Sequence, residues 1–124
     1  MLALSIRQPW AWLVVAGHKT IENRTRKTNI RGEVLIHASK TKPTEQEMAM
    51  LRRICKALRV ACPMTMQLHY GGIIGSVEIV DCITHSDSEW FTGPYGYVLK
   101  NARSIKFKEA TGNTGFFEVN YKLV

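Results

Sequence analysis

Three ionisable side chains of mixed sign, Lys19, Glu22 and Arg24, follow a short apolar segment of this sequence. In a dry cleft, a lysine beside a carboxylate can transfer protons, and an arginine fork can hold a phosphate or a base edge. Glu22 and Arg24 are two residues apart on an expected strand, so their side chains share one face. If these side chains formed only solvent-exposed ion pairs, they would contribute little to the stability of the protein. Their position, where the chain leaves a buried helix, instead indicates the floor of a cleft.

Residues around the start of that helix complete the candidate ligand site. Arg7, Gln8 and Trp10 lie where free backbone amides and the helix dipole favour an anion. Gln8 could read a base edge, and Trp10 could either stack on a base or belong to the core. His37 faces away from the apolar side chains of its strand and is included as a ligand contact, with simple packing as the alternative.

The charge of the chain favours a polyanionic partner. Its 17 Lys and Arg residues against 10 Asp and Glu give a net charge of +7, which favours nucleic acid over an acidic membrane surface. No apolar run approaches the roughly 20 residues that span a bilayer, and no basic leader precedes the apolar N-terminus. We therefore expect a cytoplasmic protein without a membrane partner. Arg52, Lys56 and Arg59 could extend a phosphate track or simply face water.

The cysteines and histidines predict neither a disulfide framework nor a metal site. The three cysteines are odd in number and lack a Cys-x-x-Cys pair, which is typical of reduced, buried thiols. His18, His69 and His85 show no spacing with cysteines or carboxylates that would build a tetrahedral site. We expect no metal, no cofactor and a monomer.

The hydrophobic pattern predicts an α+β domain over residues 1–124. Pro9 and Gly17 bracket a short helix that is apolar on all sides. Thr44 and Glu47 form a capping box for a second helix, whose buried stripe is Met48, Leu51, Cys55 and Leu58. Strands are expected over 2–6, 19–24, 33–38, 73–85, 97–99 and 116–121, with a bulge or bend at Gly75. Five or six strands with two or more helices indicate a small, strongly bent β-barrel.

Several motifs, in order along nearly the whole chain, resemble the ASCH domain family. They are Leu4-Ser5-Ile6-Arg7-Gln8-Pro9-Trp10, Gly17-x-Lys19-Thr20-x-Glu22-x-Arg24, the run from Gly32 to Ala38, Gly71 to Glu78, Gly93 to Tyr97, and Gly115 to Val119. The resemblance implies a PUA-like β-barrel flanked by helices, with a cleft that binds RNA. Similar members occur alone in bacteria and phages and also within eukaryotic coactivator proteins.

Two enzymatic branches of the family imply an alternative function. Some small bacterial members remove the acetyl group of N4-acetylcytidine with a lysine, a threonine nucleophile and a glutamate, and another member is a ribonuclease. By this resemblance Lys19 carries over, but the nucleophile's position, three residues later, holds Glu22 here. Thr20 lies one residue after the lysine and points to the opposite face of the expected strand.

The residues and the resemblance together predict an RNA- or nucleotide-binding module with a cleft lined by Lys19, Glu22 and Arg24. Such a module would act in RNA metabolism or in the regulation of transcription or translation. The alternative is a hydrolase on a modified nucleoside, or a ribonuclease, in which Lys19 and Glu22 form the acid–base pair. A third possibility is an interaction domain that binds protein partners.

Overall fold

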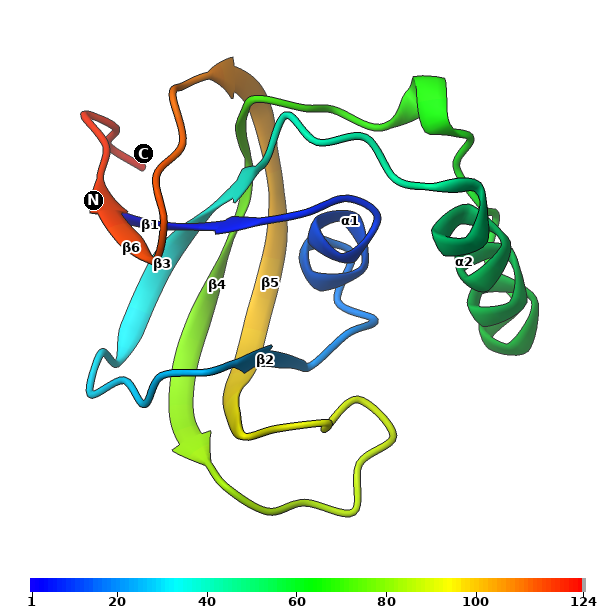
Figure 1. Ribbon diagram of the computed structural model, residues 1–124. Helices are drawn as coiled ribbons and strands as arrows, with labels where there is room; N and C mark the ends of the chain where they lie inside the picture. The colour runs from blue at the N-terminus through cyan, green and yellow to red at the C-terminus, as the bar shows by residue number, and fades with distance from the viewer. Residues whose placement is uncertain (124) are drawn as a thin grey trace.

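Six strands form one strongly curled sheet in the order β2-β5-β4-β3-β1-β6 (Figure 1). The computed structural model describes residues 1–123. The strands are β1 (Leu2–Ile6), β2 (Ile21–Arg24), β3 (Gly32–Ala38), β4 (Gly72–Ile83), β5 (Tyr95–Glu109) and β6 (Phe116–Glu118). β1 and β3 are parallel, and the other neighbouring strands are antiparallel. Two α-helices, α1 (Trp10–Val15) and α2 (Glu45–Leu58), and a 3₁₀ turn η1 (Thr65–Gln67) accompany the sheet. The predicted α+β, PUA-like architecture is confirmed.

The sheet is a half-barrel that side chains close. Its two edge strands, β2 and β6, do not pair with each other. Arg24 of β2 donates a 2.7 Å hydrogen bond across the opening to the carbonyl oxygen of Ser5 in β1. The ring of Tyr97 in β5 stacks on Phe116 of β6 with 5.9 Å between centroids. The backbone ladder therefore stops short of the expected barrel, and these two contacts link its ends.

The bend predicted at Gly75 is confirmed, and it is where α1 packs against the sheet. The register between β4 and β5 shifts between Ile73 and Gly75. A Cβ atom on Gly75 would come within 2.5 Å of the Arg103 carbonyl oxygen and of a Val15 methyl group. Glycine at this position therefore lets the helix approach the strand closely.

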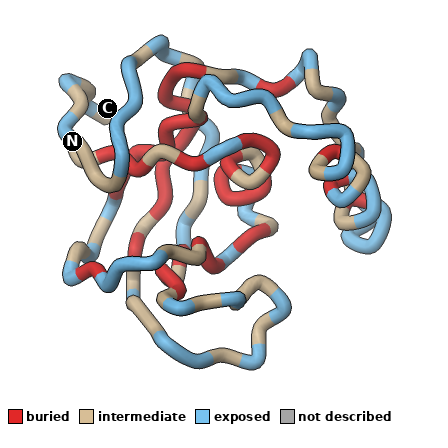
Figure 2. The backbone as a smooth tube through the Cα atoms, in the orientation of Figure 1, coloured by how far each residue is buried: buried red, intermediate tan, exposed pale blue. Residues whose placement is uncertain are grey.

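Helix α1 fills the concave side of the half-barrel, as its apolar sequence predicts. Its residues Ala11, Leu13, Val14 and Val15 are all buried, and Figure 2 shows the helix as one of the most buried parts of the chain. Gly17 ends the helix with a φ of +84°, a backbone conformation that residues other than glycine rarely adopt. The turn that follows positions Lys19.

Helix α2 begins as predicted and ends differently. The Thr44 hydroxyl accepts from the Glu47 amide, and the Glu47 carboxylate accepts from the Thr44 amide. Met48, Leu51 and Cys55 are buried, and burial raises the pKa of the Cys55 thiol to about 11. The prediction for Leu58 is wrong, because the last turn extends beyond the core and leaves this side chain 41% exposed.

Four strands differ from the predictions by two residues or more, and one of them, β4, ends at Ile83 instead of residue 85. β2 begins at Ile21 because the amides of His18 and Lys19 bond back to the Leu13 carbonyl of α1. β5 is far longer than the expected 97–99. Its length was missed in the sequence because bulges, one of them beside Asn101 at φ +54°, break the alternation of its side chains. β6 ends at Glu118. No helix within residues 1–123 is long and apolar enough to cross a membrane.

Candidate ligand-binding cleft

A hollow of about 630 Å³ lies where α1, the start of β2, α2 and the β4–β5 loop meet; we refer to it as the cleft. Its lining comprises Trp10, then Lys19, Glu22 and Asn23, then Met50, Ile54, Ala57 and Leu58, and finally Glu89, Trp90 and Thr92. The polar groups come chiefly from the segment around β2, and the α2 wall is wholly apolar. An open hollow with apolar walls and a few polar groups is typical of ligand sites.

Lys19 and Glu22 of the cleft lining belong to a chain of three charges that ends at Arg24, behind the cleft. The Lys19 ammonium donates to Oε1 of Glu22 at 3.1 Å and to the carbonyl oxygen of Ile21. The Arg24 guanidinium contacts the other carboxylate oxygen, Oε2, with Nε at 3.2 Å. The exposed fractions of these side chains are 8% for Lys19, 11% for Glu22 and 24% for Arg24. One carboxylate therefore lies between two cations, leaving a net positive charge.

This geometry leaves Lys19 able to bind a ligand. A lysine ammonium has three N–H donors, and the described residues accept two of them. Because Lys19 lines the cleft, its third N–H can reach a carbonyl, phosphate or hydroxyl oxygen of a ligand there. Both oxygens of Glu22 already accept from a cation, which holds the lysine in place.

Arg24 has less freedom to act as a ligand fork than the sequence indicates. Its guanidinium bonds both Glu22 and the Ser5 carbonyl oxygen. It is not among the residues that line the cleft. Arg24 therefore closes the half-barrel and orients Glu22.

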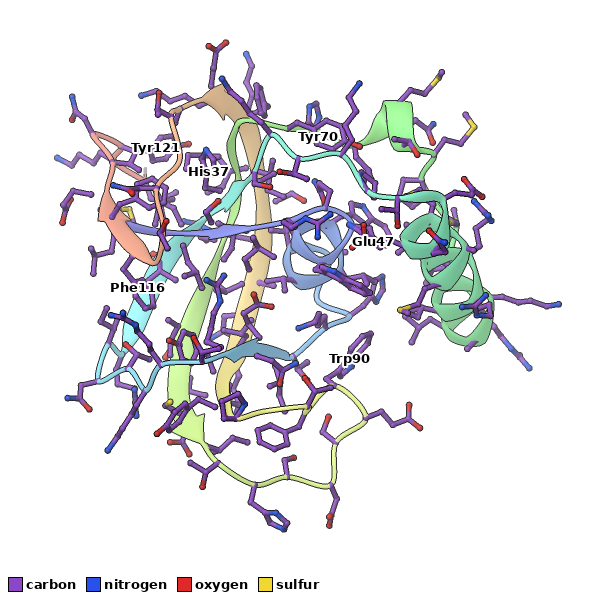
Figure 3. All side chains as sticks on the ribbon, in the orientation of Figure 1. His37, Glu47, Tyr70, Trp90, Phe116 and Tyr121 are labelled. Carbon is purple, nitrogen blue, oxygen red and sulfur yellow. The ribbon has the colours of Figure 1, made fainter. Side chains whose placement is uncertain are left out.

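The cleft has a wall that sequence reasoning missed, the β4–β5 loop. The Asn23 side chain donates to the Trp90 carbonyl oxygen at 2.8 Å and accepts from the amides of Thr92 and Gly93 at 2.9 and 3.1 Å. Figure 3 shows the Trp90 ring directed from this loop toward α1. The sequence held no signal for this wall, because the Asn23 contacts are with a loop about 70 residues further along the chain.

Of the three candidate residues around the start of α1, only Trp10 lines the cleft, and Arg7 and Gln8 do not. Arg7 is exposed and forms a 3.1 Å ion pair with Glu47 of α2. Gln8 is 1% exposed, and both ends of its amide are occupied, since Oε1 accepts from the Trp12 amide and Nε2 donates to the His69 carbonyl oxygen. Gln8 therefore fixes α1 to the chain after η1.

His37 lies apart from the cleft, on the other face of the sheet (Figure 3). It is 2% exposed. One ring nitrogen lies 3.1 Å from the Ser5 hydroxyl and the other 2.7 Å from the Ala110 carbonyl oxygen, while Phe117 packs edge-on against the ring. These contacts tie β1, β3 and the chain after β5 together.

Glu89 is the other carboxylate that lines the cleft, while the predicted basic residues of α2 and the buried Tyr97 do not line it. Arg52 pairs with Glu45 at 2.7 Å, and neither Lys56 nor Arg59 lines the cleft. Burial raises the pKa of Tyr97, with the Arg24 charge opposing that shift, so its hydroxyl stays protonated and donates to the Arg26 carbonyl oxygen. Within residues 1–123, no group of three or more His, Cys, Asp or Glu side chains is arranged to hold a metal ion.

Comparison with known proteins identifies related chains. A family model described as the ASCH domain matches residues 4–112. Activating signal cointegrator 1 is 30% identical in Homo sapiens and 28% identical in Mus musculus, each over 132 aligned residues covering 97% of this chain. The chain spans only 22% of the length of these curated relatives. A crystal structure of a ZmASCH mutant from Zymomonas mobilis aligns with a TM-score of 0.58 at 12% identity, over 96% of this chain and 87% of that chain, and supports the fold alone.

Proposed function

Since this chain belongs to the ASCH domain family, we propose that it is an RNA- or nucleotide-binding module whose ligand enters the cleft. The observation that carries the proposal is the free N–H of Lys19 beneath a hollow bordered by two tryptophans. A single unpaired base presents a flat apolar face and oxygen or nitrogen acceptors on its edge. In the cleft, the tryptophans offer a surface for the flat face of the base, and Lys19 offers a donor for its edge.

The base would rest against Trp10 and Trp90 and accept a hydrogen bond from Lys19. Phosphates would remain near the rim, since the walls are mostly apolar. Arg53 is an exposed cation one helical turn from Met50 and Ala57 of the lining, and it has no ion pair among residues 1–123. Together with the net charge of +7, it favours a polyanion. We expect such a module to act in RNA metabolism or gene regulation.

Fluorescence anisotropy with a short, labelled single-stranded RNA tests this function. Lys19→Met should weaken binding by about tenfold or more, because a charge-assisted hydrogen bond is lost. Lys56→Met removes the same charge outside the cleft and serves as the matched control, with an expected change below about twofold. Affinity should also fall steeply with salt. Salt-independent binding, or equal effects of the two variants, would contradict the proposal.

The hydrolase alternative is supported by the buried contact between Lys19 and Glu22. A lysine and a carboxylate 3.1 Å apart beside a hollow could activate a water and protonate a leaving group. Incubation of the protein with N4-acetylcytidine and with single-stranded RNA separates the two functions. Turnover that disappears in Glu22→Gln supports the enzyme, whereas binding without turnover supports the module. A third proposal, protein interaction as in a coactivator, predicts that Lys19→Met leaves partner binding intact.

A further inference from the structure

The second half of β5 has an open edge. β2 pairs with β5 only from Tyr95 to Val98, and the Leu99 amide makes a last bond to Thr20 at 2.9 Å. From residue 100 to residue 108, no strand of the described chain pairs with the side of β5 that faces away from β4. Such an edge presents unpaired N–H and C=O groups that can accept another strand.

A groove runs between this edge and helix α1. A hollow of about 270 Å³ lies between β5 residues 99–102 and Val14 of α1, and it extends to Gly17. A second hollow, of about 500 Å³, continues between β5 residues 104–107 and the α1 side chains Trp12 and Val15. We call the two together the β5–α1 groove. Trp10, which lines the ligand cleft, lines neither of them, whereas Lys19 lines both the cleft and the smaller hollow.

The groove combines the features that hold an added strand. The strand edge supplies backbone partners, and a helix supplies the opposite wall, which is the arrangement of peptide recognition by β-augmentation. Val15, Ile74 and Phe107 line the larger hollow. That hollow can take a large apolar side chain from every second residue of an extended segment.

The charges around the groove select an acidic segment. Lys100 and Lys106 are exposed, line the smaller and larger hollow respectively, and have no ion pair among residues 1–123. No aspartate or glutamate lines either hollow. A strand with carboxylates flanking its apolar residue would therefore meet complementary charge at both ends.

The same features disfavour the two other occupants. A second copy of this chain, also at +7, would place lysines against lysines, and edge lysines and bulges oppose such pairing. RNA would need free aromatic faces and phosphate contacts, but His69 already stacks on Phe107 at 5.0 Å. The other aromatic ring of the larger hollow, Trp12, packs against His18 with 5.7 Å between ring centroids, and no aromatic ring of the described residues lines the smaller hollow.

We propose that the β5–α1 groove binds an extended acidic segment of a partner protein as an additional strand on β5. Its backbone pairs with the open edge, and one large apolar side chain fills the larger hollow. Carboxylates on either side contact Lys100 and Lys106. The smaller hollow of this groove shares Lys19 with the ligand cleft, so the bound strand lies beside the nucleic-acid site.

The test uses ¹⁵N-labelled protein and a synthetic peptide with an alternating Val-Thr-Phe-Thr-Val centre flanked by glutamates. Binding should shift and protect the amides of residues 100–108 and leave those of Asn23 and Trp90, which line only the ligand cleft, unchanged. Lys100→Glu combined with Lys106→Glu should weaken affinity by about tenfold or more. Lys56→Glu, a surface control outside the groove, should have little effect.

Two altered peptides check the mode of binding. N-methylation of alternate residues removes backbone donors and should abolish binding, and replacement of the glutamates by lysines should do the same. The proposal is overturned if none of a set of peptides with Phe, Leu or Ile at the centre protects residues 100–108. It is also overturned if single-stranded RNA perturbs these amides as strongly, or if the free protein dimerises through them.

Discussion

Two buried polar clusters lie on different faces of this sheet, and only one of them adjoins open space. Lys19, Glu22 and Arg24 are linked by hydrogen bonds of 3.1 and 3.2 Å beside a hollow of about 630 Å³. Ser5 and His37 are linked at 3.1 Å, and His37 lines none of the larger hollows. Figure 3 shows His37 far from Trp90, the wall of the cleft.

The comparison shows that residue type does not by itself identify a site. A serine beside a histidine resembles catalytic chemistry as closely as a lysine beside a glutamate does. The difference is what covers each pair. Residues of the C-terminal segment, including Phe117, pack over the histidine, whereas an open loop and one face of α2 border the lysine.

The largest effect is expected from Glu22→Gln. This change leaves the nearly buried Lys19 and partly buried Arg24 cations without their shared carboxylate, so the free energy of unfolding should fall by about 3 kcal/mol. Urea denaturation measures it. Combining Glu22→Gln with Lys19→Met removes one unpaired charge and should recover part of the loss. A change below about 1 kcal/mol would show that water already screens the cluster.

His37→Ala should lower stability by about 2 kcal/mol without changing RNA affinity. The substitution empties a packed position and leaves the Ala110 carbonyl oxygen without its side-chain donor. Thermal unfolding gives the first quantity, and anisotropy on the folded fraction gives the second. His85→Ala in the exposed β4–β5 loop is the control and should be near neutral. Loss of RNA binding in folded His37→Ala would contradict the conclusion that only the Lys19 cluster takes part in ligand binding.

Trp90→Ala should differ from that pattern by weakening RNA binding, and it should also lower stability because the ring packs against the core cluster of Leu13 and Met48. The ring borders the cleft and its residue is half-buried, and a stacked base contributes about 1–3 kcal/mol. Anisotropy with the same RNA measures the change. Trp90→Phe keeps a flat ring and should retain most of the affinity. If both variants bind equally poorly, the indole acts through packing of the loop.

The smallest effect is expected from the exposed pair between Arg7, in the β1–α1 connection, and Glu47 of α2. The Thr44 backbone amide holds the pKa of Glu47 below its ordinary value of 4.5, with a further contribution from Arg7. Because the folded-state pKa is lowered, this stabilisation is present above the ordinary value and is lost as pH falls through the folded value. Because glutamine still accepts from the Thr44 amide, Glu47→Gln should cost only about 0.5 kcal/mol at neutral pH and nothing in strong acid. Melting curves across this range measure the difference.

The elements that were predicted well are those with local causes. The capping box of Thr44 and Glu47 and the bend at Gly75 follow from neighbouring side chains and backbone chemistry. The shared face of Glu22 and Arg24 follows from strand alternation. The long extent of β5 was missed because its bulges interrupt that alternation.

The sequence by itself determined the family, the order of most strands and helices, and the shared face of Glu22 and Arg24. Tertiary structure decided which polar groups meet solvent. Asn23 binds a loop that is 67 residues away in the chain. Leu58 lines a hollow and is not part of the core. Gln8 and Arg24 donate hydrogen bonds to backbone carbonyl groups of other segments. Local periodicity records which face a side chain takes, but only the packing of distant segments fixes what that face meets.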